Sequence, residues 1–169
     1  MAAVYGDGVW ANSDGLRLRF GAEQARDAKE GSPAQKGATT TLVFEVDATD
    51  LQLHTDTQER FLNRVPTVAM PAGALLRKAT FIPTTAFTGT NATLTFGLAK
   101  QDATTIDADG IDATIALTAI DAVGEEVACD GALIATKLQF DSYLTTSVGT
   151  ASFTAGKGQL IVELVIPTP

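Results

Sequence analysis

Short runs in which apolar and polar residues alternate recur along the chain, and they constrain its fold more than any other feature. Residues 16–20, 40–47 and 93–98 place an apolar side chain at every second position. This period is that of a β-strand with one face toward water. Glycine and proline separate the runs, and about seven or eight short strands are expected in all. The pattern predicts a mainly β chain that folds as an antiparallel β-sandwich with one short helix.

The remaining segments fill in this plan. Further strands are predicted at residues 74–83, near 126–129, at 133–143 and at 160–166. Residues 73–99 are predicted to form a β-hairpin whose loop is 84–91, a stretch rich in threonine, glycine and asparagine. Other segments are read as a loop at 22–37, a short helical turn or a strand continuation at 47–53, a turn at 107–110 and a tight turn at 155–158.

Residues 111–123 fit two patterns. Ile111, Ile115 and Ile120 fall at helical spacing, Asp109 could cap the start, and Gly124 could close the end. Alternate residues from 111 to 117 are also apolar, which is compatible with a strand. We predict a short helix here, and the strand remains the alternative.

The expected domain organisation is simple. Hydrophobic residues make up 45% of the 169 residues, enough apolar material for a packed core. Residues 1–14 are rich in glycine, alanine, aspartate and asparagine, and are expected to form an extended N-terminal arm. Residues 15–169 contain no linker long enough to separate two domains, so one sandwich domain is expected there.

Charge narrows the classes of partner. The net charge is −8, and residues 86–169 carry only three basic side chains against ten acidic ones. Phosphate backbones and anionic membranes repel such a protein, so neither nucleic acid nor a membrane is an expected partner. The first residues lack the basic start and apolar run of a signal peptide, and no stretch reaches the length of a membrane span. We therefore expect synthesis and retention in a cytosol.

No group of residues predicts catalysis. His54 is the only histidine and Cys129 the only cysteine, so a zinc site or a catalytic triad lacks its parts. Cys129 has acidic neighbours that would not activate a thiol, and it is expected to be a buried apolar side chain. Asp107, Asp109 and Asp112 lack the further ligands of a calcium loop and are expected in turn or cap roles. We expect no enzyme activity, no cofactor and no metal.

The candidate functional residues are surface residues. Tyr5 and Trp10 are large rings in a polar arm, which is typical of interface anchors. Arg17 with Arg19, and Arg77 with Lys78, place cations on predicted strands, where they could pair with carboxylates across a protein interface. The predicted interface set is Tyr5, Trp10, Arg17, Arg19, Arg77 and Lys78.

The order of these segments resembles a known family. A Gly-Leu-Arg-Leu-Arg-Phe-Gly strand at 15–21 precedes the strand at 42–47, Met-Pro-Ala-Gly-Ala-Leu at 70–75 and Ala-Thr-Leu-Thr-Phe-Gly-Leu at 92–98. Ile-Asp-Ala-Asp-Gly-Ile at 106–111 and Phe-Thr-Ala-Gly-Lys at 153–157 follow. This succession, over roughly residues 15–166, resembles the capsid decoration (cement) proteins of tailed bacteriophages, whose folds are jelly-roll-like β-sandwiches.

The resemblance implies a structural role in the virion. Such proteins bind the outside of the expanded capsid at symmetry axes, bridge major capsid proteins, and associate as homotrimers or sometimes dimers. The chain would then be made in the host bacterial cytoplasm and end on the capsid exterior, stabilising it. The resemblance transfers no catalytic residues and does not cover the arm.

A glycan-binding β-sandwich module of a phage fibre or cell surface is the alternative. Such modules stack exposed aromatic rings on sugars. Two tyrosines and one tryptophan are few for that purpose, and Trp10 lies in the arm.

Overall fold

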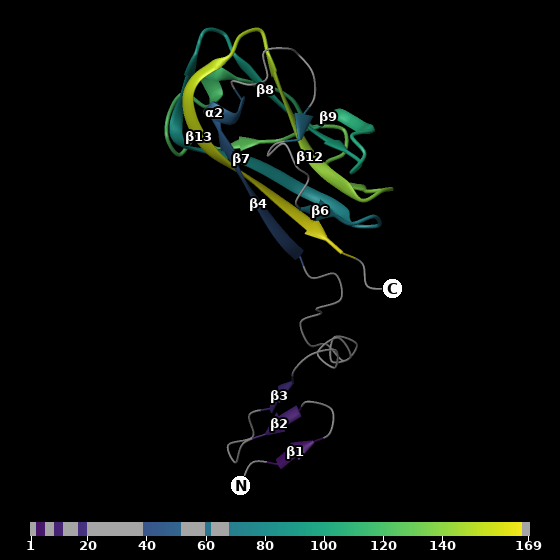
Figure 1. The fold of residues 1–169 in the computed structure, drawn as a ribbon. Helices are drawn as coiled ribbons and strands as arrows, with labels where there is room; N and C mark the ends of the chain where they lie inside the picture. The colour runs from purple at the N-terminus through teal and green to yellow at the C-terminus, as the bar shows by residue number, and fades with distance from the viewer. Residues whose placement is uncertain are drawn as a thin grey trace. The chain divides into compact units, whose positions relative to one another are not determined.

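The computed structural model describes residues 39–51 and 68–166 with their side chains. It also gives the backbone of the short strands β1 (Ala3–Tyr5), β2 (Val9–Ala11), β3 (Arg17–Arg19) and β5 (Arg60–Phe61). The chain divides into two compact units, Met1–Ala38 with Pro167–Pro169, and Thr39–Ile166 (Figure 1). The predicted loop at 22–37 and His54 lie outside the described residues. The prediction of one domain from residue 15 onward stays a prediction.

The first unit contains a small antiparallel sheet in the order β1–β2–β3. Tyr5 pairs with Val9 in one register, and Val9 pairs with Arg19 in the next. Two strands therefore lie in the segment that was expected to be an extended arm. The strand predicted at 16–20 is confirmed by β3.

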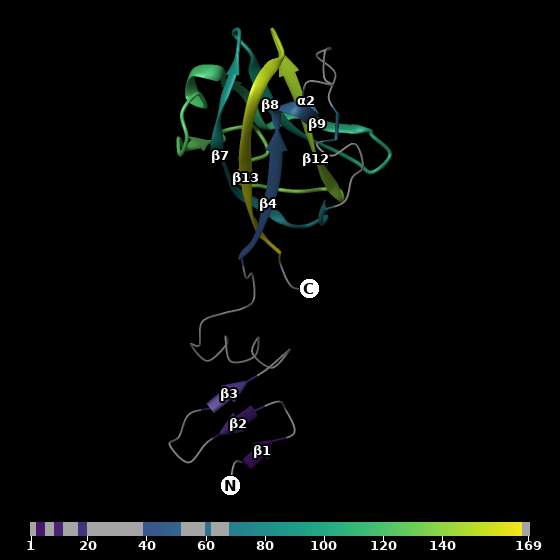
Figure 2. The ribbon, with the colours of Figure 1, turned by 60° about the vertical axis from the view of Figure 1, so that its left-hand side comes forward.

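The described part of the second unit is built from two antiparallel sheets, which confirms the mainly β sandwich fold (Figures 1 and 2). The first sheet has the order β10–β7–β13–β4, with β11 also paired to β7. Its strands are β4 (Thr39–Asp47), β7 (Leu75–Gly89), β10 (Val127–Ala128), β11 (Thr136–Lys137) and β13 (Phe153–Val165). Figure 2 shows β13 and β4 running side by side.

The second sheet has the order β5–β12–β8–β9, with β6 also paired to β12. Its remaining strands are β6 (Ala69–Met70), β8 (Thr93–Ala99), β9 (Thr105–Ala116) and β12 (Ser142–Gly149). The strands predicted at 40–47, 93–98, near 126–129 and at 160–166 are confirmed by β4, β8, β10 and β13.

Aromatic rings join the two sheets in the core. Phe81 of β7 lies 5.4 Å, centroid to centroid, from Phe96 of β8 and 5.7 Å from Phe87. Phe87 in turn meets the ring of Phe153 edge-on at 5.3 Å. All four rings are fully buried. Tilted and edge-on pairs of this kind are the arrangements that aromatic rings prefer.

The predicted hairpin at 73–99 is wrong. β7 and β8 follow each other in sequence but belong to different sheets, so the chain crosses the core between them. The segment 84–89, expected to be a loop, continues β7 and pairs with β13 through irregular registers. Along this continuation the ring of Phe87 is buried against Phe81 and Phe153, which favours the strand over a solvent-exposed loop.

The helix predicted at 111–123 is also wrong, and the strand alternative holds. Residues up to Ala116 belong to β9, and a single 3-10 turn, η3 (Leu117–Ala119), follows. Ile111 and Ile115 are buried against the second sheet's core side. Pairing with β8 supplies hydrogen bonds and burial together, which outweighs a helical spacing of apolar residues.

Three smaller predictions also changed. The residues expected to form a turn at 107–110 lie within β9 instead. They form a bulge, because Asp107 pairs with Leu98 and Asp112 with Phe96, so β9 has more residues than β8 between the two pairs. The strand expected at 133–143 is mostly turns around the two-residue β11. The tight turn expected at 155–158 is a bulged part of β13. The short helix lies elsewhere, at α2 (Ala48–Leu51), which matches the helical reading of 47–53.

Candidate interaction surfaces

Arg77 and Lys78 stand together on a bulge of β7. Lys78 pairs with Glu163 of β13 and Leu76 with Leu164, so Arg77 is an extra residue in its strand. A bulge turns consecutive side chains toward the same side, whereas a regular strand alternates them. Both cations are exposed. Neither forms an ion pair with a carboxylate among the described residues. Two free cations side by side suit a partner with carboxylates.

The other predicted interface residues lie in the first unit. Tyr5 is in β1, Trp10 in β2, and Arg17 and Arg19 in β3, and the three strands are paired in one sheet. Their side chains lie outside the described residues, and their role stays a prediction. The structure therefore brings these four residues into one small sheet, while Arg77 and Lys78 belong to the second unit.

The outer face of the first sheet carries exposed apolar residues. Ile161 of the central β13 pairs with Val43 on one side and Thr80 on the other. Val43 has 54% of its surface exposed, and Leu75 is exposed further along β7. Isolated exposed apolar residues are common, but here they share a sheet face with Lys78 and Glu163. Such a mixed face resembles the surfaces that proteins use against other proteins.

Asp47 anchors one end of that sheet. Its carboxylate accepts hydrogen bonds from the backbone N–H of Thr49 at 2.9 Å and from the Thr49 hydroxyl at 2.8 Å. Lys157 of β13 lies 2.8 Å from its other oxygen. These contacts lower the pKa of Asp47 to about 2, and the hydrogen bond from Lys157 has a larger effect than those from Thr49. This ion pair joins β4 to β13 at the surface of the sheet.

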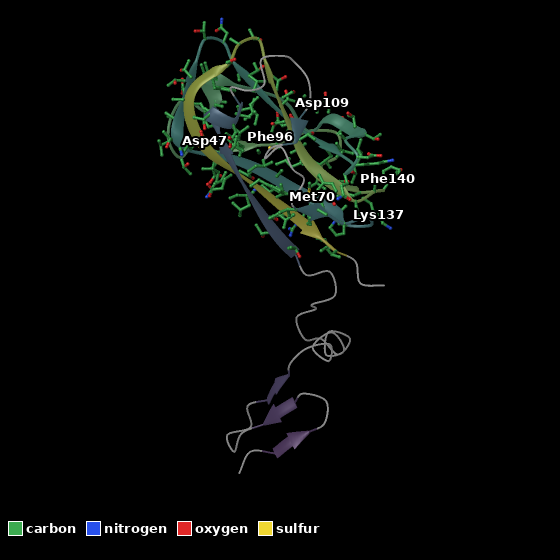
Figure 3. The ribbon with its side chains drawn as sticks, viewed as in Figure 1. Asp47, Met70, Phe96, Asp109, Lys137 and Phe140 are labelled. Carbon is green, nitrogen blue, oxygen red and sulfur yellow. The ribbon has the colours of Figure 1, made fainter. Side chains whose placement is uncertain are left out.

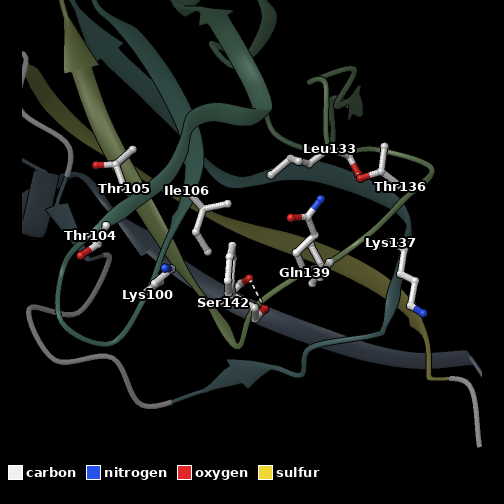
Figure 4. Close-up of a pocket in the computed structure, with 11 residues that line it drawn as sticks. Lys100, Thr104, Thr105, Ile106, Leu133, Thr136, Lys137, Gln139 and Ser142 are labelled. Carbon is white, nitrogen blue, oxygen red and sulfur yellow. Dashed lines mark hydrogen bonds between the residues drawn. The ribbon is translucent and has the colours of Figure 1, made fainter. Parts of the chain in front are cut away.

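A groove lies where the ends of the second sheet meet the turns around β11, and the sequence reasoning did not anticipate it (Figure 4). Its volume is about 490 Å³. Ile106, Leu133 and Leu138 contribute apolar surface, and Lys100 and Lys137 contribute cations. Two of the three basic residues of the acidic second half thus line one hollow. The small number of basic residues in this half could have drawn attention to Lys100 and Lys137. Only the fold places the two lysines in the same groove.

Phe140 forms part of the same groove. The Lys100 ammonium nitrogen lies 3.9 Å from the centre of its ring, a cation–π contact. Phe140 is nevertheless 45% exposed, so a large part of the ring faces solvent (Figure 3). An exposed ring beside cations is a typical binding feature, because apolar contact and charge act on one ligand.

Cys129 is buried, as predicted. Its exposed fraction is 6%, and burial followed by the nearby Asp112 carboxylate raises the pKa of its thiol to about 12. A thiol of this kind carries almost no thiolate at neutral pH and is a poor nucleophile. Asp112 is itself buried, which raises its pKa, and it accepts the N–H of Thr114 at 3.0 Å.

The aspartates of β9 have structural contacts. Besides the Asp112 bond, the Asp107 carboxylate accepts the N–H of Asp109 at 3.4 Å. Both bonds lie within β9, and not in the turn and helix cap that were expected. Within the described ranges 39–51 and 68–166, no three carboxylates, thiols or imidazoles gather as metal ligands. In the same part of the chain, no helix has the length and apolar character needed to span a membrane.

Comparison with known proteins shows a shared fold. No family model and no curated protein matches the sequence. Among solved structures, the chain is similar to a chain in the capsid of Ralstonia phage GP4, with a TM-score of 0.53 and 16% sequence identity, over 81% of this chain and 90% of that one. It is also similar to a chain in the cyanophage Pam1 capsid asymmetric unit, with a TM-score of 0.55 and 14% identity, over 93% of this chain and 98% of that one.

Proposed function

We propose that this chain is a non-enzymatic structural protein of a tailed-phage virion, which binds the outer surface of the expanded capsid and bridges major capsid proteins. The observation that carries the proposal is the similarity in fold to two chains from phage capsids, which extends over 90% and 98% of those chains.

The described surface supports a role in protein–protein contact. The second unit presents exposed cations at Arg77 and Lys78, an exposed apolar and charged sheet face, and the lysine-lined groove. Among the described residues, the Cys129 thiol is buried, and the carboxylates of Asp107 and Asp112 each accept a backbone N–H. These exposed surfaces are the ones that the proposal assigns to contact with other proteins.

The proposed mechanism is stabilisation by mass action. A protein that binds only the assembled shell adds its binding free energy to the work of disrupting that shell. Association of the chain with itself, as a homotrimer or a dimer, gives each oligomer several contacts with the capsid, and linked weak contacts produce high avidity. The acidic second half is compatible with a position on the capsid exterior, facing water.

Undecorated expanded capsids provide the test. Purified protein is added, the shells are pelleted, and the temperature at which they burst is followed by light scattering. We expect saturable co-sedimentation and a higher bursting temperature. Absence of binding, or binding that leaves the bursting temperature unchanged, would contradict the proposal.

Substitutions at Arg77 and Lys78 test whether these two residues take part in capsid binding. The double variant Arg77→Glu/Lys78→Glu is expected to bind capsids at least about 10-fold more weakly, because charge-assisted contacts are lost and repulsion replaces them. The matched control Arg77→Lys/Lys78→Arg keeps both charges and is expected to stay within about 3-fold of the original protein. Equal binding by both variants would remove these two residues from the interface.

A further inference from the structure

The lysine-lined groove has a chemical character that selects its ligand. Its apolar wall includes Phe140 and Leu138, and its cations are Lys100 and Lys137. The nearby carboxylates of Asp102 and Asp141 do not line it, and each accepts a backbone N–H, from Thr104 at 3.0 Å and from Ala72 at 2.8 Å. The groove therefore fits an apolar side chain that is flanked by carboxylates.

One loop of the same chain has that composition. Residues 121–126 read Asp-Ala-Val-Gly-Glu-Glu, and we name them the Val123 loop. Val123 is 67% exposed, the highest value for a large apolar side chain among the described residues. Asp121 and Glu126 beside it are exposed as well. An apolar tip among three acidic residues is the complement of an apolar groove with two lysines.

The Val123 loop is held in shape before any partner arrives. Gly124 adopts a left-handed conformation with φ of 83° and donates its N–H to the carbonyl of Pro83 at 3.0 Å. The N–H of Ala122 donates to the Glu125 carboxylate at 3.1 Å. A loop that is ordered in advance loses little conformational entropy on binding, which favours its use as an interface element.

The loop and the groove of one copy are far apart. The loop is attached to β7 at Pro83, whereas Lys137 of the groove pairs with Leu75 near the start of that strand. Eight residues of extended chain separate the two points on β7, a span of about 25 Å. The Val123 loop therefore cannot fill the groove of its own copy, but it can fill the groove of a neighbour.

We propose that the Val123 loop of one copy binds the lysine-lined groove of a second copy. Val123 enters the apolar part of the groove, and Asp121 and Glu126 approach Lys100 and Lys137. Two copies can make the contact twice, across a two-fold axis, to form a dimer, whereas head-to-tail repetition of the contact closes into a ring when the rotation permits. The inference rests on the self-association included in the proposed function and gives that association a contact.

The test measures self-association by sedimentation velocity in the absence of capsids. The groove variant Lys100→Glu/Lys137→Glu and the loop variant Asp121→Lys/Glu126→Lys are each expected to weaken association at least about 10-fold. A mixture of the two variants is expected to associate again, because each reversed surface meets a surface of opposite charge. Circular dichroism and melting temperatures confirm that both variants are folded.

A neutral substitution tests the apolar part of the contact. Val123→Ser is expected to weaken association about 10-fold. Val68→Ser, at an exposed valine that belongs neither to the Val123 loop nor to the groove, is expected to leave association unchanged. Glu125 is left intact in every variant because it holds the loop.

Three outcomes overturn the inference: a chain that is monomeric at 100-fold above the concentration used for capsid binding, charge-reversal variants that associate like the original protein, or a mixture that does not recover. A groove variant that associates normally but no longer binds capsids would assign the groove to a capsid protein instead. Failure of capsid binding alone leaves this measurement untouched, so the two proposals fail separately.

Discussion

At the scale of single residues, Asp47 connects three parts of the fold. It ends β4, accepts two hydrogen bonds from Thr49 at the start of α2, and pairs with Lys157 of β13. The side chain of Lys157 is 65% exposed, so the ion pair itself contributes little to stability in water. The capping bond to the N–H of Thr49 is the more valuable interaction.

Asp47→Ala is expected to lower the free energy of unfolding by about 1 kcal/mol at pH 7. Since the pKa of Asp47 is lowered in the folded state to about 2, its contribution is fully present above pH 4 and is lost as the pH falls through about 2. The difference between variant and original protein should therefore shrink between pH 4 and pH 2.

Urea denaturation at several pH values measures this difference. Asp50→Ala removes an exposed carboxylate from the adjacent helix α2 and serves as the control, with little expected effect. A difference for Asp47→Ala that stays constant down to pH 2 would show that its carboxylate charge is not what stabilises the junction.

At the scale of elements, the bulge in β9 depends on a glycine in its partner strand. Gly97 of β8 lies directly beneath the Ala108 carbonyl, and a Cβ atom at Gly97 would overlap that oxygen. The extra residues of β9 can therefore fold over β8 only because position 97 has no side chain. The same bulge carries Gly110 toward Leu133, at the side of the groove.

Gly97→Ala is expected to destabilise the protein by about 3 kcal/mol or more, because the clash involves backbone that cannot move aside. Gly124→Ala is the matched control, since a Cβ there meets nothing within 4 Å and only the left-handed φ opposes it, at a cost of about 1 kcal/mol. Thermal and urea unfolding compare the two. Similar losses for both variants would contradict the proposed role of Gly97.

At the scale of the whole molecule, the second unit has a core of its own. The buried apolar cluster runs from Phe44 to Leu164 and draws on both sheets. The members that the structure describes all come from the unit Thr39–Ile166. A hydrophobic core contained in one unit is the usual condition for independent folding.

A chain consisting of residues 39–169 is therefore expected to unfold cooperatively, with a free energy of unfolding within about 1 kcal/mol of the full chain. Urea denaturation followed by circular dichroism checks this. A non-cooperative transition would show that residues 1–38 complete the core. The same shortened chain is expected to bind capsids more weakly if Tyr5 and Trp10 act as the interface anchors that the sequence predicts.

Local patterns in the sequence were sufficient for several features. Strict alternation marked β4 and β8, because side chains on a half-buried strand must alternate whatever the strand pairs with. The burial of Cys129 followed from its acidic and small neighbours. The exposure of Arg77 and Lys78 was also expected, although the bulge that turns both outward was not.

Tertiary contacts determined the rest. Apolar residues at 111–117 satisfy helical and strand spacing alike, and the availability of β8 as a partner selected the strand. The sheet that β7 joins depends on β13, whose residues pair with β7 across separations from Gly89–Phe153 to Leu75–Val165, and no local pattern encodes such distant pairs. The groove likewise combines residues 100–106 with 133–142. Alternation of apolar and polar residues is a property of one segment. Strand pairing and the groove depend on contacts between segments that are distant in the sequence, and the free energy of those contacts is not encoded in any one segment.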